Sequence, residues 1–145
     1  MTQGTGLPRL IVVGVDGSPS SRAALRWALD IARLTGAAVR AITVWRIPVS
    51  YAHVPDWSDM DLAGAASSTL VDTVSEVAVD DDPSVETVVL EGAAAPALLE
   101  AAEAADLLVV GSRGRGGFAG LLLGSVTTYC VHHASCPVVV VPAPA

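Results

Sequence analysis

RLIVVGVDGSPS, residues 9–20, joins a continuous apolar run to a turn that can begin a helix. The β-branched run up to Val15 is typical of a strand that is covered on both faces of a parallel sheet. After it, Ser18 can cap a helix, Pro19 can occupy its first position, and Gly36 can end it. This stretch therefore predicts a buried parallel strand followed directly by a helix.

The rest of the chain repeats this alternation of strand and helix. Further strands are expected in AVRAITVW (38–45), VETVVLEG (85–92), DLLVVGS (106–112) and PVVVV (137–141). Helices are expected from residue 59 to about 79, from Pro96 to about 105, and in GSVTTYCVHHA from Gly124. Because right-handed crossovers join such strands, we predict an α/β fold: three α/β/α layers around one open, five-stranded parallel sheet, Rossmann-like in type.

Length and composition favour a single domain, residues 1–145, because 52% hydrophobic residues can fill one core and no linker interrupts the chain. The apolar blocks are too short to cross a bilayer, and the N-terminal residues lack the features of an export signal. We therefore expect no membrane partner, a cytoplasmic location, and reduced thiols at Cys130 and Cys136.

The formal net charge is −7, and all eight residues counted as Lys or Arg are arginines. A nucleic-acid partner needs a broad basic face, which this sequence does not offer. The absence of lysine excludes Walker-type phosphate binding and Schiff-base chemistry. Beyond Arg46, the only arginines are Arg113 and Arg115, both in GSRGRGGF (111–118).

Glycines are spaced regularly from this segment onward. Gly111 and Gly114 are followed, after nine further residues, by Gly124 and Ser125. Glycines let backbone N–H groups approach an anion, and the N-terminus of a helix adds partial positive charge. The alternative interpretation is a flexible connection whose arginines serve solubility. Because the segment follows a buried strand and precedes a capped helix, we favour a phosphate site.

Three residues mark the ends of expected strands: Asp16, Val44 and Gly111. In doubly wound sheets, ligands bind beyond the carboxyl ends of the strands, where the strand order reverses. We therefore expect these residues to face one crevice.

These motifs resemble those of the universal stress proteins, whose nucleotide-binding branch carries G-x2-G-x9-G-(S/T). The resemblance extends to VVGVDGSPSSRAALRWA near the start and SCPVVVVP near the end. It implies strand order 3-2-1-4-5 and binding of ATP or a related adenine nucleotide, with Mg²⁺ or Mn²⁺ held mainly by the phosphates. It also implies a homodimer through the last strand, Pro137 to Val141.

The resemblance further implies roles for individual positions. Asp16 would lie near the ribose and phosphates, and the backbone of Val44 would recognise the adenine edge. Gly111 and Gly114 would form the ribose and phosphate loop, and the segment from Gly124 would hold the outer phosphates. No catalytic residue and no protein metal ligand is assigned. The candidate nucleotide-binding set is Gly14, Val15, Asp16, Val44, Gly111, Ser112, Arg113, Gly114, Arg115, Gly124, Ser125, Val126 and Thr127.

Other clusters favour simpler interpretations. Cys130, His132, His133 and Cys136 have the residue types of a zinc site without the paired spacing of known structural sites. The run Asp80–Asp82 lacks the spacing of a calcium loop and is interpreted as a solvated helix end. The long connection from Arg46 to Ser58 is either a lid or a packing excursion.

Three functions follow from these observations. The leading hypothesis is a nucleotide-binding regulatory protein of the stress-response type. The second is an enzyme that slowly hydrolyses or transfers the phosphates of ATP, for which Asp16 is the only well-placed general base. The third is a dimeric interaction module that does not use nucleotide.

Overall fold

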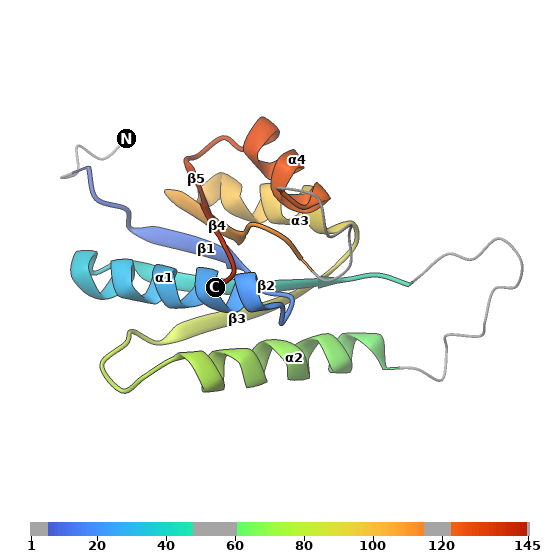
Figure 1. The fold of residues 1–145 in the computed structure, drawn as a ribbon, viewed down its shortest axis with the longest axis horizontal. Coiled ribbons are helices and arrows are strands. Elements are labelled where there is room, and N and C mark those ends of the chain that lie inside the picture. Colours follow the sequence, from blue (N-terminus) through green and yellow to red (C-terminus); the bar gives the residue numbers. More distant parts are fainter. Residues whose placement is uncertain (1–5, 48–60, 115–122, 145) are drawn as a thin grey trace, which may run out of the picture.

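The computed structural model describes residues 6–47, 61–114 and 123–144; Arg115 and residues 48–58 of the long connection lie outside them. Within the described residues, one sheet has the strand order β3-β2-β1-β4-β5, with every pair parallel, as predicted. The elements in chain order are β1 (Leu10–Gly14), α1 (Pro19–Thr35), β2 (Ala38–Trp45), α2 (Leu62–Val77), β3 (Val85–Glu91), α3 (Ala94–Ala101), a 3-10 turn η2 (Ala102–Ala104), β4 (Leu107–Gly111), α4 (Ser125–His133) and β5 (Val138–Val141) (Figure 1).

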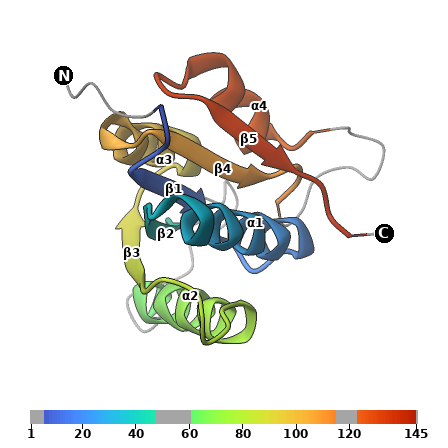
Figure 2. The same ribbon diagram turned by 90° about the vertical axis from the view of Figure 1, so that its left-hand side faces the viewer.

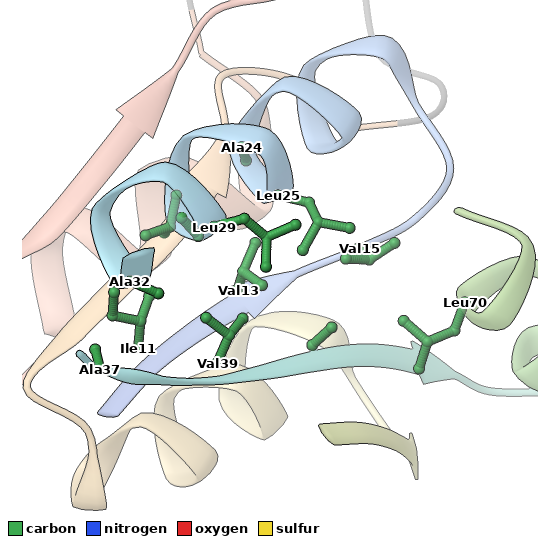
Figure 3. Packing of buried hydrophobic residues seen from close by; sticks show 13 residues of the cluster. Ile11, Val13, Val15, Ala24, Leu25, Leu29, Ala32, Ala37, Val39 and Leu70 are labelled. Carbon is green, nitrogen blue, oxygen red and sulfur yellow. The ribbon is translucent and has the colours of Figure 1, made fainter. Parts of the chain in front are cut away.

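The sheet is covered on both faces, with α1 and α2 on one side and α3 and α4 on the other (Figure 2). Successive side chains of a strand point to opposite faces, so β1 contributes to two cores. Ile11 and Val13 pack against Leu25 and Leu29 of α1 (Figure 3), whereas Val12 packs in the second core, under α3 and α4. This two-sided burial explains why the strand sequences are continuous apolar runs.

The first helix begins and ends where its sequence predicts. The Ser18 side chain accepts a hydrogen bond from Ser21 N at 3.3 Å, and Pro19 is the first helical residue. Gly36 has φ +80° and donates its N–H to Ala32 O at 2.8 Å. A left-handed residue at this position favours glycine.

Two other helices start away from their expected positions. Helix α3 begins at Ala94, so Pro96 is its third residue rather than its first. Proline is tolerated there because the first N–H groups of a helix have no intrahelical acceptor. Helix α2 begins at Leu62 and is capped by Asp61, whose carboxylate accepts Gly64 N at 2.8 Å. Within the described residues, no helix is long and apolar enough to cross a membrane.

The interpretation of Asp80–Asp82 as a solvated helix end is wrong for Asp82. Its two carboxylate oxygens receive the Arg26 guanidinium at 2.8 and 2.9 Å, and Val79 N donates at 2.8 Å. Arg33 adds a contact at 3.2 Å, and these partners leave 1% of the Asp82 side chain exposed. The hydrogen bonds from Arg26 hold the pKa of Asp82 at about 2, below its ordinary value of 3.8. The sequence pattern did not reveal this because the arginine partners belong to α1, far away in the chain.

Replacing Asp82 with Asn should lower the free energy of unfolding at pH 7 by about 1 kcal/mol, because the bidentate ion pair is lost. The lowered pKa means that the ionised carboxylate stabilises the fold above about pH 4 and loses this effect as the pH falls toward 2. Denaturant unfolding at several pH values measures the difference. Asp81→Asn is the matched control, and an equal effect of both variants at pH 7 would contradict the assignment.

Candidate functional site

A cavity of about 350 Å³ lies at the carboxyl edge of the sheet. It forms there because β1 pairs with β2 on one side and with β4 on the other, so the ends of three strands meet. Asp16, Val44 and Gly111 all line it, as their positions at strand ends predict. The other lining residues from the predicted set are Gly14, Val15, Arg113, Gly114, Gly124, Ser125, Val126 and Thr127. Arg115 lies outside the described residues.

Ser112 belongs to the predicted set but is absent from the cavity lining. Its N–H donates to Val141 O at 2.8 Å, and its carbonyl accepts Gly124 N at 2.8 Å. Ser112 therefore ties the loop after β4 both to the end of β5 and to the start of α4.

The loop glycines are needed for space. A Cβ on Gly111 would lie 2.7 Å from Ser20 C and 2.8 Å from Ser21 N, both backbone atoms of α1. A Cβ on Gly114 would lie 2.6 Å from Asp16 Oδ2. Neither glycine has a positive φ. Glycine thus lets the loop pack tightly between the first turn of α1 and the end of β1.

One end of the cavity presents backbone donors. Gly124 is the N-cap residue of helix α4, and no side-chain hydrogen bond caps this end. The first hydrogen bond of the helix runs from the Thr128 N–H to Gly124 O at 2.9 Å. The N–H groups of Ser125–Thr127 have no acceptor among the described residues. Three orphan donors at a helix N-terminus, with the helix dipole behind them, favour an anion.

Two residues that carry a charge line the cavity at this end, Asp16 and Arg113. Asp16 Oδ1 accepts Ser18 N at 2.9 Å, while Oδ2 faces the position of Gly114. Arg113 is the only cationic residue among the described residues that line the cavity. The polar end therefore combines the Asp16 carboxylate and the Arg113 residue with the N-terminus of α4.

The opposite end of the cavity is apolar. It is formed by Ile42 and Val44 on one face of β2, Val110 of β4, and Ala94 and Leu98 of α3. Of these residues, only Val44 was predicted from the sequence. The alternation of side chains along β2 and β4 predicts which residues of each strand share a face. It does not predict that α3 closes over that face.

The Val44 backbone adds hydrogen-bonding groups to this apolar end. Ile42 O accepts Val15 N at 2.8 Å, so alternate residues of β2 point toward β1. The next residue pointing that way is Val44, beyond the last pairing of β1, which joins Gly14 to Ile42. Among the described residues, neither its N–H nor its carbonyl has a partner. One donor and one acceptor thus lie side by side at an apolar surface.

Ser18 and Ser21 line the cavity and were also missed. Ser18 was interpreted only as the helix cap, a role that it does have. The Ser21 hydroxyl donates to Ser18 O at 3.1 Å and accepts Asp16 N at 3.3 Å. Both serines therefore support the turn that presents Asp16.

The cysteine and histidine cluster does not come together as a set of metal ligands. No group of three or more His, Cys, Asp or Glu side chains suited to a metal ion occurs among the described residues. Cys130 is buried in the core under α3 and α4, and burial raises the pKa of its thiol. The His133 ring lies 4.3 Å from the Tyr129 ring, centroid to centroid.

Comparison with known proteins places this architecture in a family. The family model described as "Universal stress protein family" matches residues 8–142. A universal stress protein of Mycobacterium tuberculosis (strain ATCC 25618 / H37Rv) is 36% identical over 146 residues, which cover 92% of this chain and 44% of the relative. The chain thus spans about half the length of the curated relatives it matches.

Two solved structures extend the comparison. Universal stress protein UspA from Lactobacillus plantarum superposes with a TM-score of 0.78 at 27% identity, covering 92% of this chain and 97% of that one. A universal stress protein in complex with cAMP superposes with a TM-score of 0.66 at 30% identity, covering 95% and 99%. Fold, sequence and family model agree, and the chain belongs to the universal stress protein family.

Proposed function

We propose that this chain is a cytoplasmic regulatory protein of the stress response that binds ATP or a related adenine nucleotide in the cavity. The observation that carries the proposal is the convergence of unpaired N–H groups from Gly114 and Ser125–Thr127 on a cavity whose other end is apolar. The related structure with cAMP supports an adenine nucleotide as the ligand class.

The two ends of the cavity favour one orientation of the nucleotide. The base would lie on Ile42, Leu98 and Val110, because a flat apolar ring system gains most from burial there. The unpaired N–H and carbonyl of Val44 match an adenine edge, which offers a ring-nitrogen acceptor beside an amino donor. The phosphates would then reach Gly114 and the N-terminus of α4.

A divalent metal, Mg²⁺ or Mn²⁺, fits the polar end. The Asp16 carboxylate supplies a hard oxygen ligand close to the proposed phosphate position, and phosphate oxygens would provide most of the others. The metal would neutralise repulsion between Asp16 and the phosphates.

Gly124→Ala tests the phosphate end without a steric clash. The added methyl group would lie 3.4 Å from Gly114 N, an ordinary contact that covers this donor. We expect ATP affinity to fall at least tenfold, about 1.4 kcal/mol, while adenosine, which lacks phosphates, binds as to the wild type. Isothermal titration calorimetry measures both ligands. Folded wild-type protein that binds no ATP at millimolar concentration would refute the proposed function.

We further propose a homodimer through β5, which is an edge of the sheet. Leu108 N bonds to Pro137 O and Ser112 N to Val141 O, so these residues face β4 and the backbone of Val140 faces outward. An unpaired apolar edge strand invites pairing with a second copy.

Val140→Pro should therefore dissociate the dimer while leaving the β4–β5 pairing intact, because it removes only an outward N–H. Sedimentation velocity at micromolar concentration measures the oligomeric state. Val139→Pro is the matched comparison, since it removes an inward N–H and should destabilise the fold itself. A wild-type monomer, or a dimer that survives Val140→Pro, would contradict the interface.

A further inference from the structure

The Arg113 carbonyl is held by side chains from the first turn of α1. Ser20 Oγ donates a hydrogen bond to it across 93 residues of sequence, and Ser18 Oγ lies at 3.5 Å. Arg113 N in turn donates to Ser20 Oγ at 3.4 Å. Ser20 is 2% exposed and is absent from the cavity lining. Any effect of Ser20 on a ligand must therefore act through the loop.

This contact fixes the orientation of the Arg113–Gly114 peptide. In a trans peptide, the C=O and N–H groups point in opposite directions. Because the carbonyl is directed at α1, the Gly114 N–H is directed away from α1, and it has no acceptor among the described residues. Gly114 N lies 3.4 Å from the ideal Cβ position of Gly124, a cavity residue. The donor thus faces the start of α4.

The neighbouring peptides of the loop have other supports. Thr127 Oγ1 donates to Gly111 O at 2.6 Å, and both backbone groups of Ser112 are bonded to main-chain atoms. The hydroxyls of Ser20 and Ser18 contact the Arg113 carbonyl. Gly114, with no Cβ, would allow this peptide to rotate. Rotation would turn a carbonyl toward the bound anion in place of an N–H.

Building on the proposed function, we propose that Ser20 is a positioning residue for the nucleotide phosphates. Its hydroxyl selects the peptide orientation that presents the Gly114 N–H, and not the Arg113 carbonyl, to a phosphate oxygen. The loop thereby becomes a donor site before the ligand arrives, which reduces the free energy that binding must supply to order it.

The test compares ATP with adenosine in titration calorimetry. Ser20→Ala keeps the Cβ and removes only the hydroxyl, so ATP affinity should fall about tenfold while adenosine affinity is unchanged. Ser20→Thr, which keeps the hydroxyl, should restore ATP affinity. Thr73→Val is the matched control, because it removes a buried hydroxyl of α2 that bonds to Thr69 O at 2.7 Å, away from the cavity. Thr73→Val should leave the ratio of ATP affinity to adenosine affinity as in the wild type.

Three outcomes would overturn the proposal. If folded Ser20→Ala binds ATP like the wild type, Ser20 has no positioning role, while the proposed function stands. If ATP and adenosine weaken equally, Ser20 only stabilises the fold. If the wild type binds neither ligand, the proposed function fails and this role fails with it. Thermal melting shows whether Ser20→Ala is folded. If Ser20→Ala is not folded, Ser20→Cys replaces it, because its S–H is only a weak donor. The ratio of ATP affinity to adenosine affinity of Ser20→Cys then decides whether Ser20 has a positioning role.

Discussion

The parallel pairing of β1 with β2 on one side and β4 on the other is the constraint from which the site follows. It brings three strand ends to one edge, and it leaves β2 extending to Trp45 beyond the last pairing of β1. That overhang exposes the Val44 backbone. The same arrangement delivers Asp16 and Gly111 to the edge.

Backbone groups dominate the polar end of the cavity, which suits a protein with a formal net charge of −7. A globally acidic surface repels an anion, so attraction must come from groups at short range. Orphan N–H groups and the dipole of α4 provide it without many cations. This requires loop and helix to approach closely, and bulkier residues at Gly111 or Gly114 would collide with α1 or Asp16.

The sequence predicts the features that depend on local pattern. Strand and helix alternation, the caps of α1 and the glycine spacing all lie within short stretches, and the fold agrees with them. The strand order is expected only from the resemblance to the universal stress proteins, and the sheet confirms it. What it misses depends on contacts between distant segments. Leu98 reaches the cavity only because α3 covers the sheet, and Asp82 is enclosed by arginines of α1. Ser20 looks like an ordinary first-turn residue until the loop lies against it.

Amide NMR spectra recorded during addition of ATP and, separately, of adenosine test the central claim most directly: that backbone donors at one end of the cavity hold the phosphates. The account predicts that ATP shifts the amide resonances of Gly114 and Ser125–Thr127 together with that of Val44. Adenosine should shift Val44 and leave the other four nearly unchanged. Equal shifts of the Gly114 and α4 amides with both ligands, or ATP-dependent shifts confined to residues outside the cavity, would contradict it.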